Sequence, residues 1–114
     1  ATINEIFKKY NYLCDTHTAV AVNVYEEYTK RTGDDTPTVI ASTANPYKFS
    51  ASVLSAITDD IKSEDEFSMV EELFEKSKEP VPPQLATLKG KAPRFTRVSD
   101  KEDMAQVVFD MLGI

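Results

Sequence analysis

Two short stretches of this sequence gather side chains that could bind a ligand. The first, residues Asp15 to Val20 (DTHTAV), places an acid, an imidazole and two hydroxyls at the start of a predicted helix. The amino end of a helix carries a partial positive charge and unpaired backbone amides, which attract polar and anionic groups. The stretch therefore gathers several hydrogen-bonding side chains at a place that could bind a ligand.

The second stretch, residues Ser42 to Phe49 (STANPYKF), follows a predicted strand at its carboxyl end. In open α/β sheets, ligands bind in the crevice outside those strand ends. A hydroxyl at Thr43 would there meet a polar atom of the ligand. In the alternative interpretation, Ser42 and Thr43 only satisfy the backbone of the turn and Lys48 is solvated.

Other candidate sites are weaker. Cys14 and His17 are close enough in sequence to suggest a nucleophile and its base, or else Cys14 is a small buried apolar residue beside a helix start. A cluster of acids is either a cation site or a solvated helix start, and it lacks the glycine and the spacing of a calcium loop: Asp59, Asp60, Glu64, Asp65 and Glu66. The sequence contains no dinucleotide fingerprint, P-loop, zinc-protease motif or nucleophile elbow.

Composition excludes several classes of protein. The chain has 114 residues and a net charge of −6, with a pI near 4.7. This acidity argues against binding to nucleic acids or anionic membranes, and no apolar run is long enough to span a membrane. One cysteine and one histidine cannot form a disulfide or a zinc cluster, so we predict no metal and a cytoplasmic location.

The pattern of apolar residues predicts about five helices. An apolar stripe predicts the first helix over Ile3 to Tyr10. The second runs from Asp15, as N-cap, to Arg31, and its nearly all-apolar segment Ala19 to Val24 predicts burial against a large surface. A helix over Phe49 to Ile57 follows. The remaining two begin at predicted capping boxes, Ser63 with Glu66 and Ser99 with Glu102.

One or two short strands are expected among these helices. Thr38 to Ser42 is the predicted buried strand, Arg94 to Val98 is a possible second one, and the prolines at 80–83 predict an extended linker. The expected fold class is therefore α/β and helix-rich. Because so few strands do not form a stable sheet, we expect residues 1–114 to be an incomplete domain, and the initial Ala1 suggests a trimmed chain.

Taken together, the two polar stretches resemble a known enzyme family. DTHTAV followed by STANPYKF resembles the C-terminal part of threonine synthase, whose members typically show Asp-Pro-His-Thr-Ala and then Ser-Thr-Ala-His-Pro-Ala-Lys-Phe. The later Pro80-Val-Pro-Pro-Gln-Leu and the final amphipathic helix also match, so the resemblance covers almost the whole chain. Thr16 stands where the family has proline. Asn45 stands where it has histidine, which removes any imidazole role at that position.

The resemblance implies the C-terminal segment of the cofactor-binding region of a fold-type-II pyridoxal-phosphate enzyme. Such an enzyme is a carbon–oxygen lyase that converts O-phospho-L-homoserine and water to L-threonine and phosphate. Thr43 matches the family hydroxyl that hydrogen-bonds the pyridine nitrogen of the cofactor. His17 and Thr18 would lie near the active-site wall, and Lys48 in the phosphate-rich pocket.

The resemblance also implies what this chain lacks. The lysine that carries the cofactor and the loop that binds its phosphate belong to the N-terminal part of the family, and neither is recognisable here. We therefore expect the remainder of the same polypeptide as partner, no catalytic residue in this segment, and no activity and weak or absent cofactor binding for the chain alone. The alternative is a freestanding acidic α/β module whose helix faces bind a partner protein.

Overall fold

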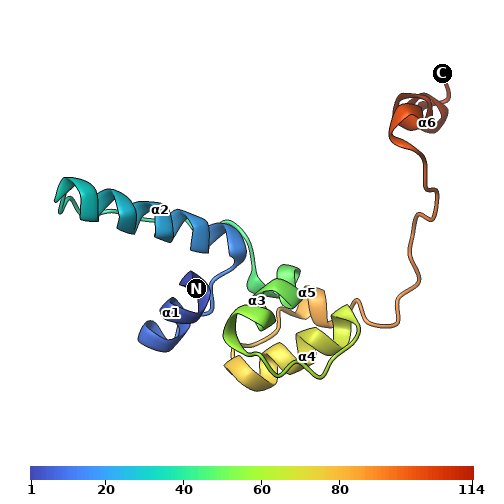
Figure 1. The fold of residues 1–114 in the computed structure, drawn as a ribbon. Helices are drawn as coiled ribbons and strands as arrows, with labels where there is room; N and C mark the ends of the chain where they lie inside the picture. The colour runs from blue at the N-terminus through green and yellow to red at the C-terminus, as the bar shows by residue number, and fades with distance from the viewer.

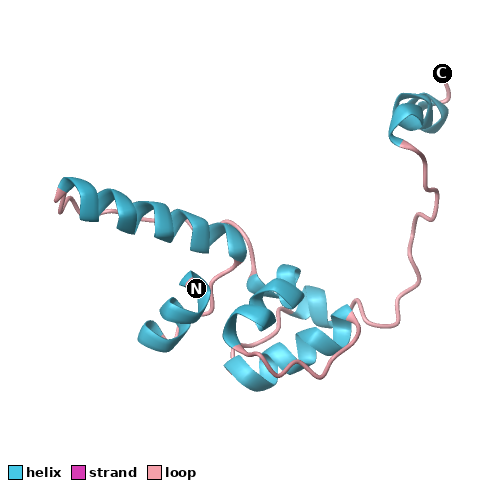
Figure 2. Cartoon of the chain, viewed as in Figure 1, coloured by secondary structure: helices cyan, strands magenta, loops and turns pink.

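The computed structural model describes residues 1–114 and contains helices but no strand (Figure 2). Six α-helices and two short 3-10 helices follow one another along the chain. Their bounds are α1 (Thr2–Tyr10), α2 (Thr16–Thr32), η1 (Pro46–Phe49), α3 (Ser50–Ile57), α4 (Glu66–Ser77), α5 (Pro83–Ala86), η2 (Lys101–Asp103) and α6 (Met104–Leu112). No helix is both long enough and apolar enough to cross a bilayer.

The core lies where α3 packs against both α1 and α4, and the start of α2 joins it (Figure 1). Ile3 and Ile6, from the predicted stripe of the first helix, are buried there. Val53, Leu54 and Leu73 are fully buried between α3 and α4. The apolar spacing thus identified Ile3 and Ile6 as inward-facing residues of α1, whereas Tyr10 at the end of that stripe is 63% exposed. The buried apolar residues are Ile3, Ile6, Leu13, Cys14, Ala19, Tyr47, Val53, Leu54 and Leu73.

Helix α2 begins and ends where its sequence predicts. The Asp15 carboxylate accepts hydrogen bonds from the backbone amides of His17 and Thr18, and Gly33 ends the helix with a φ of +72°. That left-handed conformation is one that glycine adopts without steric cost. The alternating Val20, Val22 and Val24 would also suit a strand, but the two caps define the segment as a helix.

The large surface expected to cover Ala19 to Val24 is not supplied by residues 1–114. Ala19 is buried, but Val20 is 64% exposed and Val24 is 62% exposed. Helix α2 projects beyond the rest of the body, and α1 is the helix that packs against it (Figure 1). Val22 is partly buried against the core, whereas residues 1–114 leave Val20 and Val24 uncovered.

Both predicted strands are also wrong. Residues 38–42 are irregular and Val39 is 95% exposed, while in residues 94–98 Phe95 and Val98 are 71% and 92% exposed. No backbone–backbone hydrogen bond involves residues 34–44. A strand exists only through bonds to a neighbouring strand. With no second strand in the chain, an apolar sequence of strand type stays irregular, and the α/β class is replaced by an all-helical one.

The predicted cap of α4 is displaced by two residues. Asp65, not Ser63, accepts the amides of Phe67 and Ser68 and is the N-cap. Ser63 instead donates its hydroxyl to the carboxylate of Glu72 at 2.6 Å, and the amide of Ser63 bonds to the same carboxylate at 3.0 Å. The acid closest to the first helical turn therefore takes the capping role.

The C-terminal part of the chain extends away from this body (Figure 1). The expected proline linker is partly wrong, because Pro83 begins the short helix α5, where its missing amide costs nothing. Residues 91–100 have no helix or strand. The radius of gyration is 18.8 Å, whereas a compact chain of this length has about 13 Å.

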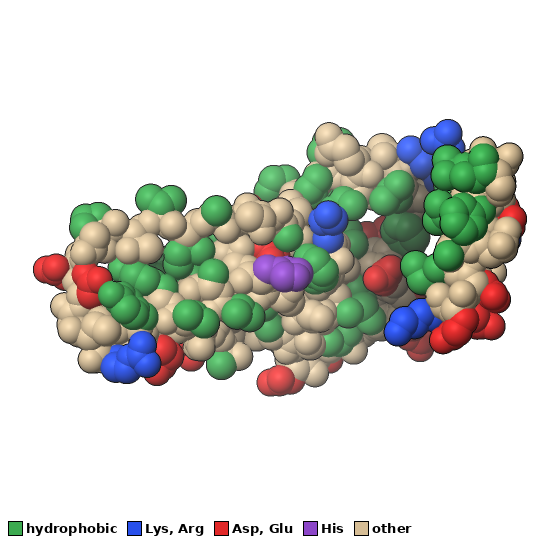
Figure 3. Space-filling model, turned by 90° about the horizontal axis from the view of Figure 1, so that it is seen from above, with side chains coloured by type: hydrophobic (Ala, Val, Ile, Leu, Met, Phe, Trp, Pro, Cys, Tyr) green, Lys and Arg blue, Asp and Glu red, His purple; other side chains and the backbone are tan.

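Helix α6 carries the predicted apolar stripe and ends at Gly113, but Ser99 does not cap it. The 3-10 turn η2 precedes α6, and the N-cap Asp103 makes no side-chain capping bond. Much of the stripe is exposed, including Met104, Met111 and Leu112. Figure 3 shows hydrophobic side chains gathered at the end of the molecule where α6 lies.

Candidate functional site

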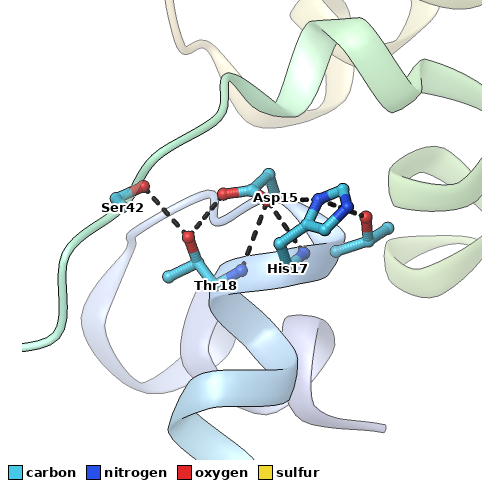
Figure 4. A network of polar contacts seen from close by, with 5 residues as sticks. Asp15, His17, Thr18 and Ser42 are labelled. Atoms are coloured by element: carbon cyan, nitrogen blue, oxygen red, sulfur yellow. Dashed lines mark hydrogen bonds and ion pairs between the residues drawn. The ribbon is translucent and has the colours of Figure 1, made fainter.

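The two polar stretches of the sequence meet in space at the start of α2 (Figure 4). The hydroxyl oxygens of Thr18 and Ser42 lie 3.1 Å apart, although the residues are 24 positions apart in sequence. The rings of His17 and Phe49 also approach, with centroids 4.9 Å apart and planes tilted by 57°. Side chains from both stretches therefore form one cluster.

Asp15 organises this cluster. Its side chain is fully buried, and one carboxylate oxygen accepts the His17 amide at 2.8 Å and the Thr18 amide at 3.3 Å. The other oxygen accepts the Thr18 hydroxyl at 2.5 Å. Burial disfavours the charged carboxylate, but the hydrogen bonds from Thr18 and His17 outweigh it and lower the pKa of Asp15 below its ordinary value. Asp15 is thus held as a buried carboxylate.

The Thr18 hydroxyl links this acid to the second stretch. Thr18 has one hydroxyl proton, which it donates to the charged Asp15 carboxylate in the short contact. In the contact with Ser42, the Ser42 hydroxyl is consequently the donor and the Thr18 oxygen the acceptor. Thr18 is 6% exposed. Both sides of its hydroxyl are occupied within the chain.

His17 differs from Thr18 in facing solvent. Its side chain is 64% exposed, and Nδ1 lies 3.2 Å from the Asp15 carboxylate. A proton on Nδ1 donates to that acid and leaves Nε2 as an acceptor. The acid fixes the ring orientation, and the tilted Phe49 ring lies beside it. His17 is therefore a positioned imidazole at the surface of the cluster.

Thr43 lies directly after Ser42, in irregular chain before η1. It is exposed, and no hydrogen bond within the chain engages its hydroxyl. Its neighbours are engaged: Ser42 contacts Thr18, and the side-chain oxygen of Asn45 caps η1 by accepting the Tyr47 amide at 2.9 Å. Thr43 is the hydroxyl of this stretch that is left available to a ligand.

Lys48 is exposed and forms no ion pair within the chain. It lines a hollow of about 270 Å³ together with residues of η1, α4 and α5, among them Phe67 and Leu85. His17, Thr18 and Thr43 do not line this hollow. The structure thus brings His17 and Thr18 together beside the Ser42–Thr43 segment and places Lys48 at a separate hollow.

Cys14 is fully buried, and burial raises the pKa of its thiol above the ordinary value. It forms no hydrogen bond with His17, whose ring contacts Asp15 instead. The geometry agrees with the interpretation of Cys14 as a small apolar core residue. The acids at 59–66 are not brought together in a group of three or more with metal-binding geometry.

Two contributions to this site were not assigned from the sequence. Asp15 was predicted as a helix cap but not as the acid that bonds Thr18, and Ser42 was not predicted to reach α2. The capping pattern gave a signal for Asp15, since a buried N-cap acid has a spare oxygen. Nothing in the sequence signalled the contact of Ser42, because it depends on how the chain returns to α2.

Comparison with known proteins assigns the chain to a family. The family described as "Threonine synthase, C-terminal" matches residues 18–108. The match begins at Thr18 within the first stretch, contains all of the second, and includes the proline-rich segment and much of α6. No solved structure matches the chain. The resemblance found in the two polar stretches is confirmed, and the chain belongs to the threonine synthase C-terminal family.

Proposed function

We propose that this chain is the C-terminal part of a pyridoxal-phosphate-dependent lyase that converts O-phospho-L-homoserine and water to L-threonine and phosphate. Membership of the family assigns a role in threonine synthesis as part of a parent enzyme. The observation that carries the proposal further is the cluster at the start of α2. It brings together both stretches on which the resemblance rests and leaves the Thr43 hydroxyl accessible.

The residues present fit one edge of the cofactor. Thr43 offers an unengaged hydroxyl, and a hydroxyl can donate to the pyridine nitrogen without supplying the negative charge that would keep that nitrogen protonated. When bound, the cofactor supplies an electron sink for the chemistry at the amino acid. The role of Thr43 is to orient the ring and to set the electron demand of its nitrogen.

His17, Thr18 and Lys48 take different roles in this proposal. His17 presents an imidazole whose orientation is fixed by Asp15, which suits a side chain of the active-site wall. Thr18 lies behind it, with its hydroxyl engaged. Lys48 carries an unpaired ammonium group and would attract the phosphate of the substrate.

We further propose that the isolated chain is inactive. All ten lysines are exposed, and none lies in a desolvated pocket of the kind that activates an amine as a nucleophile: Lys8, Lys9, Lys30, Lys48, Lys62, Lys76, Lys78, Lys89, Lys91 and Lys101. The remainder of the polypeptide would supply the lysine that binds the cofactor. The uncovered apolar faces of α2 and α6 support an incomplete domain with such a neighbour.

The contact of Thr43 is tested in the intact enzyme. Thr43→Ala removes the hydroxyl, and Thr43→Ser retains it as the matched control. We expect Thr43→Ala to lower turnover and cofactor affinity by about 1–3 kcal/mol, because a buried polar atom of the ring loses its partner. Thr43→Ser should lose much less turnover and cofactor affinity. Wild-type turnover and cofactor affinity in Thr43→Ala would remove Thr43 from the site.

A second candidate function is favoured by the same uncovered surfaces. Val20 and Val24 on α2, and Met104 and Met111 on α6, are each at least 59% exposed, as expected of a freestanding module that binds a partner protein. Mixing the chain with the remaining part of the enzyme separates the two functions. Recovery of threonine synthesis supports the enzyme part, whereas a chain that never associates with that remainder supports the module.

A further inference from the structure

The segment that carries Thr43 has one hydrogen-bonded attachment to the rest of the molecule. Residues 37–44 contain no helix and make no backbone–backbone hydrogen bond. The hydroxyl of Thr38 bonds only within the segment's own neighbourhood, to the carbonyl of Thr36. The contact between Ser42 and Thr18 is the hydrogen bond that joins this segment to another element. The position of Thr43 therefore depends on it.

This attachment is rigid on the side of α2. The Asp15 carboxylate is fixed by the two backbone amides of the first helical turn and is fully buried. It accepts the Thr18 hydroxyl at 2.5 Å, which sets the rotamer of Thr18 and directs its remaining acceptor site toward Ser42. The start of α2 thus determines where residues 37–44 run, through the side chains of Asp15, Thr18 and Ser42 (Figure 4).

Thr43 has a second anchor on its other side. Tyr47 is 4% exposed, and its hydroxyl donates to the carbonyl of Glu79 at 2.5 Å. Asn45 caps η1 between the two anchors. Thr43 lies between Ser42 and this fixed turn, with a hydroxyl that no residue of the chain engages. Removal of the Ser42 attachment would leave it held from one side only.

We infer that Thr18 is a positioning residue, which through Ser42 holds the Thr43 hydroxyl at the place where it meets the cofactor ring, and that Thr18 does not itself line the active-site wall. The inference rests on the proposed role of Thr43. It assigns Asp15 as the buried acid that orients Thr18. It also separates Thr18 from His17, whose ring faces solvent.

The test compares Thr18→Val with Thr18→Ser in the intact enzyme. Valine has nearly the shape of threonine but removes the hydroxyl, and it leaves both capping amides of Asp15 in place. Serine retains the hydroxyl. We expect Thr18→Val to raise the rate of proteolytic cleavage within residues 41–45 severalfold and to weaken cofactor binding about tenfold. Thr18→Ser should stay close to wild type, and cleavage within α4 should not change in either variant.

A separate variant guards against loss of folding. Ser42→Ala removes the other half of the attachment at an exposed position, where unfolding is not expected. It should loosen residues 41–45 and weaken cofactor binding as Thr18→Val does. An unchanged rate of cleavage within residues 41–45 in Ser42→Ala overturns the inference, and so does equal loosening in Thr18→Val and Thr18→Ser.

The inference and the proposed function fail in different ways. If Thr43→Ala binds the cofactor as wild type while Thr18→Val still loosens residues 41–45, the cofactor contact is overturned and the attachment is supported. If Thr43→Ala weakens cofactor binding while Thr18→Val changes neither the cleavage rate of residues 41–45 nor the cofactor affinity, the proposed function stands and the positioning role is overturned.

Discussion

The body formed by α1, α3 and α4 and the C-terminal helix α6 have amphipathic sequences with different outcomes. In the body, the apolar side chains of the three helices face one another, and Val53, Leu54 and Leu73 are fully buried. In α6 the equivalent stripe is largely exposed, with Met111 and Leu112 each 66% exposed. An amphipathic pattern therefore specifies a helix and its apolar face, whereas burial requires a partner surface within reach.

The largest expected difference between the two regions is at Leu73. Leu73→Ala leaves a cavity between α3 and α4, which should lower the free energy of unfolding by about 2–5 kcal/mol. Urea unfolding of the chain, followed by helical circular dichroism, measures this loss. A loss below about 1 kcal/mol would contradict the view that this packing holds the body together.

The next largest effect is expected when a buried N-cap residue is replaced, compared with the replacement of an exposed one. Asp15 and Asp65 each accept two backbone amides, but only Asp15 is buried and also bonds the hydroxyl that reaches Ser42. In the same measurement, Asp15→Ala should lower the free energy of unfolding by about 2 kcal/mol and Asp65→Ala should lower it by about 1 kcal/mol. Equal losses would show that burial of the Asp15 cluster adds nothing to stability.

Lowering the pH should reduce the stability of the body more than that of α6. Hydrogen bonds lower the pKa of Asp15 against the opposing effect of its burial, and the Ser63 hydroxyl and nearby amides lower the pKa of Glu72. Near pH 4 the unfolded chain therefore binds more protons than the folded one. The stability that these groups confer is complete above their ordinary pKa values, 3.8 and 4.5, and is lost as pH falls through the folded values.

Unfolding measured from pH 7 to pH 2 checks this effect. Asp15→Asn and Glu72→Gln should each reduce the loss of stability on acidification. Asp110→Asn is the matched control on α6, where the bonds from Gln106 and Arg97 lower the pKa of an exposed acid. The control should change the pH dependence much less than Asp15→Asn does, because Asp110 is exposed and solvent screens its interactions. A control effect as large as that of Asp15→Asn would contradict the contrast between the regions.

The smallest effect is expected on α6 itself. Met111→Ala removes a side chain that is 66% exposed and should change the unfolding free energy of the chain by less than about 0.5 kcal/mol. The same unfolding experiment measures it beside Leu73→Ala. A loss comparable to that of Leu73→Ala would show that α6 buries its stripe against another surface in solution.

Local signals predicted α1 and α2 well. Apolar spacing identified Ile3 and Ile6 as buried, and Asp15 and Gly33 marked the ends of α2, because caps and stripes act within a turn or two of the chain. Residues 38–42 and 94–98 were mispredicted as strands. Their apolar character favours an extended conformation, but the hydrogen bonds of a strand come from elsewhere in the chain.

In the candidate site, too, the residue types were predictable from the sequence but the contacts between distant residues were not. The residue types at 15–20 and 42–49 indicated a polar site and its family, and the family is confirmed. The contact between Thr18 and Ser42 was not predicted. It depends on the path that the chain takes after α2, and beyond the turn in which Asp34 accepts the Thr36 amide, residues 37–44 contain no motif that fixes this path.

By itself the sequence determined the existence of the five helices of eight or more residues, where α2 starts and stops, and which family the chain belongs to. Each of these depends on residue types at short spacing or on a motif read in order along the chain. Only the tertiary structure decided that α6 stays uncovered, that residues 38–42 form no strand, and that Ser42 returns to Thr18. Those outcomes depend on whether a partner group lies within bonding distance, which spacing along a chain does not specify.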